Sequence, residues 1–144
     1  MTYFTAGTVK RRLECAFLQW SSGGSVNTAC PLTLLNHNWS SSPVINGTGD
    51  GLVLPAGSYM ASAYVYATRT TATQNVLFQF FLGGSAIGMS GNSDVYQNGA
   101  NVDQADAEFT LTSSNTLELK ITGVESSIPT LLPYCRIVLW RVQT

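Results

Sequence analysis

Short runs of alternating apolar and polar residues, separated by clusters of Gly, Pro, Ser and Asn, dominate this sequence. Alternation with a period of two is the pattern of a half-buried β-strand, and no segment keeps a helical period for three turns. The sequence therefore predicts an all-β chain with eight or nine strands, which suits a sandwich or jelly roll. We expect strands over residues 13–20, 32–35, 51–54, 58–68, 75–82, 85–89, 105–111, 116–121 and 134–142.

The breaks between these strands predict how the chain reverses. Pro55 to Gly57 and Gly83-Gly84 have the residue types that tight turns require. The polar bend Ser113 to Asn115 predicts that residues 109–112 and 117–121 are neighbouring antiparallel strands. The longer stretches 21–30, 36–50 and 90–104 are expected to be surface loops.

The faces of the strands differ in a way that bears on assembly. Leu117, Leu119 and Ile121 alternate with polar residues, so that strand has one face on the core and one in water. Residues 58–68 and 134–142 have apolar side chains on both faces. In a two-layer sandwich only one face of each sheet meets the core, so another subunit is expected to cover the second face.

Charge and length limit the classes of function. Charged residues make up 10% of the 144 residues and the net charge is -1, without the basic stripe that nucleic-acid binding requires. No apolar run is long enough to span a membrane. No signal peptide is recognisable, so synthesis in a cytosol is expected. The strand pattern predicts one domain over residues 13–144, preceded by an N-terminal arm over residues 1–12.

The residues that enzymes use are sparse. His37 is the only histidine and belongs to a polar loop segment, so we expect no Ser-His-Asp or Cys-His arrangement and no enzymatic activity. Cys15, Cys30 and Cys135 lack CxxC spacing and are expected to be buried free thiols. No metal or cofactor is expected. A calcium site is the alternative for the clustered carboxylates, which are Asp94, Asp103, Asp106 and Glu108.

Three stretches give the sequence a likeness to a known superfamily. They are Gly-Leu-Val-Leu-Pro-Ala-Gly-Ser-Tyr at 51–59, Ser-Asn-Thr-Leu-Glu-Leu-Lys-Ile at 114–121 and Arg-Ile-Val-Leu-Trp-Arg-Val at 136–142. In these stretches the chain resembles the globular heads of the complement and tumour-necrosis-factor superfamily, a trimeric jelly roll that bacteriophage virion proteins also use. The resemblance implies a β-sandwich of two antiparallel sheets and a homotrimer. It places Tyr64, Tyr66 and Trp140 at the trimer contact.

The expected function within this resemblance is structural. We expect a capsid decoration, or cement, protein that binds the major capsid protein on the virion surface as a trimer after synthesis in the host cytoplasm. Its attachment residues would lie in the arm, at Tyr3, Phe4, Val9, Lys10, Arg11 and Arg12. The alternative is the receptor-binding head of a phage tail fibre or spike, with Asn38-Trp39 and Tyr96 to Asn98 stacking on and hydrogen-bonding a glycan.

Overall fold

Within the residues that the structure describes, the chain folds into strands alone. The computed structural model describes residues 9–17, 26–39, 44–68, 74–95, 100–124, 130–131 and 135–143. The strands are β1 (Val9–Phe17), β2 (Leu32–His37), β3 (Val44–Ile45), β4 (Leu52–Leu54), β5 (Gly57–Thr68), β6 (Gln74–Leu82), β7 (Ser85–Val95), β8 (Ala100–Leu111), β9 (Asn115–Val124), β10 (Thr130–Leu131) and β11 (Arg136–Gln143). No helix of the described residues is long and apolar enough to cross a membrane.

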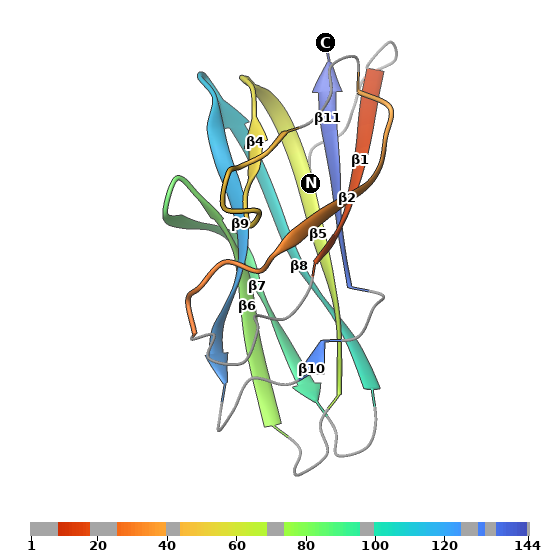
Figure 1. Cartoon of the computed structure of the whole chain (residues 1–144), viewed down its shortest axis with the longest axis vertical. Helices are drawn as coiled ribbons and strands as arrows, with labels where there is room; N and C mark the ends of the chain where they lie inside the picture. Colours follow the sequence, from red (N-terminus) through yellow and green to blue (C-terminus); the bar gives the residue numbers. More distant parts are fainter. Residues whose placement is uncertain are drawn as a thin grey trace.

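The strands form two antiparallel layers that share one edge (Figure 1). The first layer, which we call sheet A, has the order β2-β1-β11-β5-β8, and β10 pairs with the end of β5. The second, sheet B, has the order β7-β6-β9-β4-β3. β7 also aligns with β8 through the pair Met89 and Asp106, which joins the two layers. This is the predicted all-β jelly roll.

The core lies between the layers and follows from the alternation along each strand. Tyr59, Ala61, Ala63 and Val65 of β5 are at most 2% exposed, whereas the residues between them point away from the core. Sheet B contributes Phe78 and Phe80 of β6 together with the buried side chains of β9, which are Leu117, Leu119 and Ile121. The polar face of β9 carries the ion pair between Lys120 and Glu118, at 3.1 Å. The predicted faces of this strand are therefore confirmed.

The predicted pairing of residues 109–112 with 117–121 is wrong. β8 pairs with β5 in sheet A, and β9 pairs with β6 and β4 in sheet B. The bend at Ser113 carries the chain across from one layer to the other, where the amide of Gly83 donates to the Thr116 carbonyl at 3.1 Å. Alternation shows that each strand has a core face but does not reveal which strand lies beside it.

Two loop predictions are also wrong. Residues 90–95 continue β7 and residues 100–104 begin β8, so most of the predicted loop 90–104 is strand; residues 96–99 lie outside the described part. The predicted loop 36–50 loses its first residues to β2 and contains β3. These segments are polar because they lie at strand ends and at an edge, and composition alone gives them the character of loops.

Strand β1 begins at Val9 and not at the expected Leu13. Val9 to Arg12 pair in register with β11, from Gln143 to Trp140. The strand therefore begins four residues before its expected start, because a partner strand satisfies backbone groups that the sequence pattern left unassigned. Residues 1–8, including Tyr3 and Phe4, lie outside the described residues.

Candidate assembly surface

The outward face of sheet A combines apolar and charged side chains on neighbouring strands. Because Ala61, Ala63 and Val65 point into the core, the residues between them along β5 point outward. Residues of β1, β11 and β8 that pair in register with these outward residues lie on the same face. We call this surface the assembly face and define it by Arg12, Met60, Ser62, Tyr64, Met89, Asp106, Glu108, Val138 and Trp140.

Trp140 lies in a row that crosses four strands of sheet A. Arg12, Trp140, Met60 and Glu108 are successive partners in the registers of β1, β11, β5 and β8. The guanidinium carbon of Arg12 is 5.7 Å from the centroid of the Trp140 ring, within the range of a cation–π contact. The indole is half-buried. This end of the assembly face is therefore both aromatic and charged.

The next row is held by hydrogen bonds. The Ser62 hydroxyl donates to Oδ1 of Asp106 at 2.6 Å, and Nε2 of Gln104 donates to the same oxygen at 2.8 Å. Ser58 and Thr110 join their hydroxyls at 3.0 Å further along the same pair of strands. Fixed carboxylate and hydroxyl groups cost little conformational entropy when a partner binds them.

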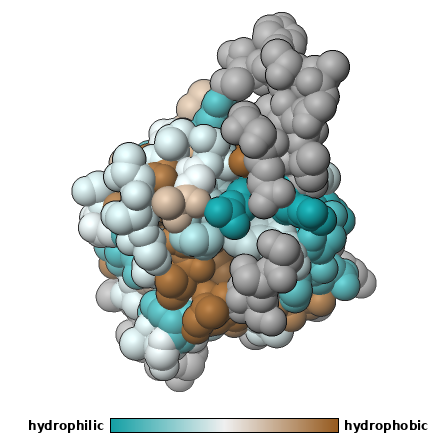
Figure 2. Space-filling view, turned by 90° about the horizontal axis from the view of Figure 1, so that it is seen from above, coloured by the Kyte–Doolittle hydropathy of each residue, from teal (hydrophilic) through white to brown (hydrophobic). Residues whose placement is uncertain are grey.

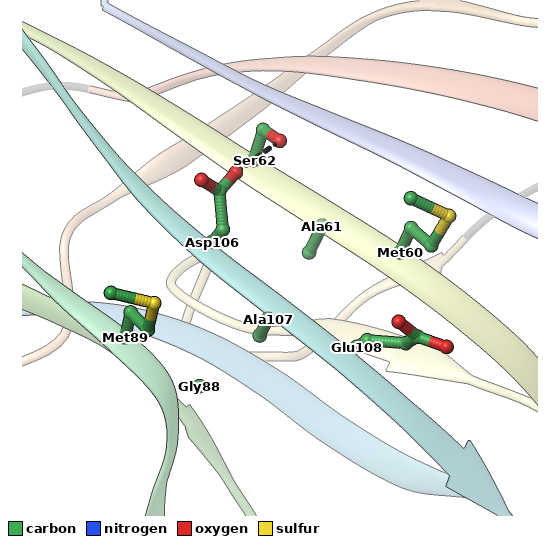
Figure 3. Close-up of a pocket in the computed structure, with 8 residues that line it drawn as sticks. All are labelled: Met60, Ala61, Ser62, Gly88, Met89, Asp106, Ala107 and Glu108. Atoms are coloured by element: carbon green, nitrogen blue, oxygen red, sulfur yellow. Dashed lines mark hydrogen bonds between the residues drawn. The ribbon is translucent and has the colours of Figure 1, made fainter. Parts of the chain in front are cut away.

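A groove opens on the assembly face where β7 passes beside β8. It has a volume of about 470 Å³ and is lined by Met60, Ala61, Ser62, Gly88, Met89, Asp106, Ala107 and Glu108. Figure 3 shows Met60 and Met89 on opposite sides of the β8 strand that carries Asp106 and Glu108. The Met89 side chain is 76% exposed. Thioethers adapt to irregular surfaces, and they are common where proteins bind one another.

The three predicted trimer residues share this side of sheet A but do not form one cluster. Tyr64 is 38% exposed and pairs in register with Arg136, whereas Trp140 pairs with Met60, two rows away. Tyr66 is half-buried and packs against the core. Its amide donates to the sulfur of Cys135, and that thiol donates back to the Tyr66 carbonyl, both at 3.2 Å.

Sequence reasoning missed the methionines and carboxylates of the groove. The sequence pattern correctly predicted that the strand carrying Met89 starts at Ser85. It did not predict that this strand, β7, turns onto β8. A glycine inside the strand, at position 88, is the local sign of this turn in the sequence. In the structure its φ is +68°, a conformation that residues other than glycine rarely adopt. A strand glycine of this kind marks a bulge or a close approach between backbones.

The predicted attachment residues divide between the two faces of β1. Arg12 is on the assembly face, whereas Arg11 has the parity of Leu13 and Cys15 and points toward the core side. The side chains of Val9 and Lys10 lie outside the described set, as do Tyr3 and Phe4. Of the predicted attachment residues, the described side chains of Arg11 and Arg12 therefore point to opposite faces of β1.

The residues considered for catalysis or metal binding lie apart. His37 is exposed at the end of β2 and lines a hollow of about 230 Å³ with Arg12, Asn36 and Asn38. Among the described side chains, no group of three His, Cys, Asp or Glu is arranged to hold a metal ion. The side chains of Asp94 and Asp103 are outside that set.

The cysteines are buried free thiols, as the sequence predicted. Burial raises the pKa of both Cys15 and Cys30 from 9.0 to about 12. A thiol with this pKa stays protonated near neutral pH and is a poor nucleophile. These two groups therefore belong to the core packing and offer no reactive centre.

The burial of Trp39 contradicts the expectation that Asn38-Trp39 stacks on a glycan. The indole is 8% exposed and packs on Tyr59 with ring centroids 6.0 Å apart. A sugar cannot stack on a ring that the core already covers. Tyr96 to Asn98, the other suggested contact, lie outside the described residues.

Comparison with solved structures identifies the fold. Murine APRIL at pH 8.5 matches with a TM-score of 0.66 and 14% identity, covering 92% of this chain and 99% of that one. The globular domain of zebrafish complement 1qA matches at 0.60 and 9% identity, covering 92% and 96%. Eiger TNF from S. frugiperda matches at 0.60 and 14% identity, covering 92% and 93%. No protein-family model and no curated protein matches the sequence. The chain therefore has the jelly-roll fold of the TNF and C1q heads.

Proposed function

We propose that this protein is a non-enzymatic assembly module that forms a homotrimer through the assembly face and decorates a bacteriophage capsid. We infer the trimer from the assembly face on the outside of sheet A, where apolar and polar side chains lie next to one another. In a monomer it would leave Met89, Tyr64 and Met60 in contact with water, next to fixed polar groups. Contiguous apolar surface rimmed by polar residues is typical of protein–protein interfaces.

The distribution of charge favours a head-to-tail contact between copies. Arg12 and Arg136 lie on β1 and β11, whereas Asp106 and Glu108 lie on β8, on the other side of β5. A contact that joins two different patches is heterologous, and it closes into a ring when the rotation allows. The trimer implied by the family resemblance is one such ring.

The assignment to a capsid rests on the character of the remaining surface. Charged residues are 10% of the sequence, against about 25% in typical soluble domains, and the net charge is -1. Such a surface has little charge repulsion to keep molecules apart, which favours packing into a shell. Attachment through Tyr3 and Phe4 remains part of this proposal.

Light scattering of the purified protein tests the trimer. We expect a mass of three chains at micromolar concentration for the natural sequence. Met60→Lys introduces a charge at the centre of the assembly face and should give a folded monomer. Leu77→Lys is the matched control, because Leu77 is 40% exposed on β6 in the other sheet and should leave the trimer intact. A monomer at micromolar concentration for the natural sequence would refute the assembly.

Binding to undecorated capsids tests the location. We expect the purified protein to occupy the shell, and deletion of Met1 to Gly7 to reduce occupancy while the trimer mass stays unchanged. Binding to host cells but not to capsids would replace this proposal with the tail-fibre head. Equal occupancy with and without the deletion would rule out attachment through Tyr3 and Phe4.

A further inference from the structure

Two arginines lie side by side at one end of the core, near the start of β1 and the end of β11. Figure 1 shows these two strand ends at the top of the sandwich. Arg11 of β1 and Arg141 of β11 are register partners, and both have the parity of the buried residues Leu13 and Leu139. Cβ atoms of paired residues in an antiparallel sheet lie about 5 Å apart. The same row continues across sheet A through Tyr59 and Phe109.

Aromatic rings fix one side of this arginine pair. Tyr59 stacks on Phe109 with centroids 5.4 Å apart, and Trp39 packs on Tyr59. The guanidinium carbon of Arg141 is 6.0 Å from the centroids of both Trp39 and Tyr59. Figure 2, which views the molecule from above, shows strongly hydrophilic residues beside an apolar patch at this end.

The N–H donors of Arg11, Arg141 and Trp39 outnumber the acceptor oxygens that they contact. Arg11 donates from Nη1 to the Asn38 carbonyl at 3.3 Å, and Arg141 donates from Nη2 to the Ala56 carbonyl at 2.8 Å. Both acceptors are neutral. Nε of Arg11 and Nε1 of Trp39 are buried and have no hydrogen-bond partner. Among the described residues, no carboxylate forms an ion pair with either arginine.

An unpaired buried donor costs about 1–3 kcal/mol, and two adjacent like charges add repulsion. A negatively charged group with several acceptor oxygens relieves both costs at once. Guanidinium groups match carboxylate and phosphate oxygens in geometry, with two parallel hydrogen bonds to each anion. Trp39 is more than nine-tenths buried, so its indole N–H is a donor that is already held in place.

We propose that Arg11, Arg141 and Trp39 form a binding site for a small oxyanion. The site recognises the oxygens that phosphate, sulfate and carboxylate groups share. It is independent of the assembly face, because both arginines are on the opposite side of sheet A. Binding an anion to the folded state raises the free energy of unfolding, since the unfolded chain has no such arrangement.

Calorimetric titration with inorganic phosphate at constant ionic strength tests the site in the full-length protein. We expect saturable binding by the natural sequence, and a higher midpoint of thermal unfolding in phosphate than in chloride. Acetate, titrated in the same way, distinguishes a site that also accepts planar carboxylates from one that requires a tetrahedral anion. Absence of saturable binding to both anions would overturn the proposal.

Variants assign the binding to these residues. Arg11→Gln and Arg141→Gln should each weaken phosphate binding by at least about tenfold, because each removes charged hydrogen bonds. Trp39→Phe keeps the apolar ring but lacks the N–H, and should also weaken binding. Lys120→Gln, which removes a positive charge from the outer face of β9 in the other sheet, is the control and should bind like the natural sequence. If Arg141→Gln fails to fold, Arg141→Lys keeps the charge and should retain weakened binding. Equal affinity in all variants would refute the assignment.

Discussion

Gly88 decides how β7 leaves sheet B and reaches sheet A. Its φ is +68°, and a Cβ there would lie 2.1 Å from the carbonyl oxygen of Asp106 and 2.7 Å from two atoms of Ala107. Glycine therefore meets two requirements at this position, the backbone conformation and the close approach of β8. Nε2 of Gln79 donates to the Gly88 carbonyl at 3.2 Å, which holds the irregular segment in place.

Gly88→Ala should lower the free energy of unfolding by more than about 2 kcal/mol, because both strain and steric overlap oppose the methyl group. Gly84→Ala is the control. Its φ is +87° but nothing lies within 4 Å of the added Cβ, so only strain of about 1 kcal/mol is expected. Urea unfolding measures both values. Equal losses in the two variants would show that the approach to β8 is not what requires glycine.

The raised thiol pKa values make stability depend on alkaline pH. The unfolded chain ionises Cys15 and Cys30 near their ordinary pKa of 9.0, whereas the folded chain keeps them protonated to about 12. Between these values the unfolded state binds fewer protons, so the free energy of unfolding should fall as pH rises from 9 to 12. Cys15→Ala should make the fall less steep. Thiol labelling should be slow in the native protein and fast in denaturant; rapid native labelling of Cys15 or Cys30 would contradict their burial.

At the scale of elements, β6 and β9 show what alternation can and cannot determine. In β9 the alternate residues Leu117, Leu119 and Ile121 are buried, as the pattern predicts. In β6, Leu77 and Phe81 are apolar although they point away from the core. Phe81 is half-buried beneath Lys120, whose Nζ is 4.7 Å from the ring centroid, and Leu77 is 40% exposed. On the outward face of β6, the Lys120 side chain of the neighbouring strand therefore covers part of Phe81, whereas Leu77 is exposed to water.

Leu119→Ala should cost about 2–5 kcal/mol of unfolding free energy, because the side chain is 1% exposed and its removal leaves a cavity between the sheets. Leu77→Ala removes the same atoms from an exposed position and should cost less than about 1 kcal/mol. Chemical denaturation of the two variants measures the difference. A loss at Leu77 as large as that at Leu119 would mean that the outer face of β6 is covered, which would contradict the exposure of Leu77.

At the scale of the whole molecule, a trimer links stability to concentration. If three chains dissociate when they unfold, the midpoint of thermal unfolding should rise by about 3 °C for a tenfold increase in protein concentration. Met60→Lys should remove this dependence because its unfolding no longer involves dissociation. Scanning calorimetry at several concentrations gives the slope. A concentration-independent midpoint for the natural sequence would argue against assembly even if the core is intact.

The sequence by itself determined where most of the strands lie and which of their faces meets the core, because a residue's burial in a half-exposed strand follows from its parity. Leu117, Leu119 and Ile121 needed no other information. The turn at Gly83-Gly84 was equally local: both glycines have positive φ, and β6 and β7 pair on either side of them. These features depend on contacts between near neighbours or on the division between core and water.

Only the tertiary structure decided which strands are neighbours and which side chains meet across the sheets. The bend at Ser113 leads from one sheet to the other, β7 turns onto β8 at Gly88, and Arg11 lies beside Arg141 across 130 positions of sequence. No local pattern encodes these pairings, because backbone hydrogen bonds between strands are the same whatever the side chains. The assembly face and the arginine pair arise from register, and register is settled by the packing of the whole sandwich.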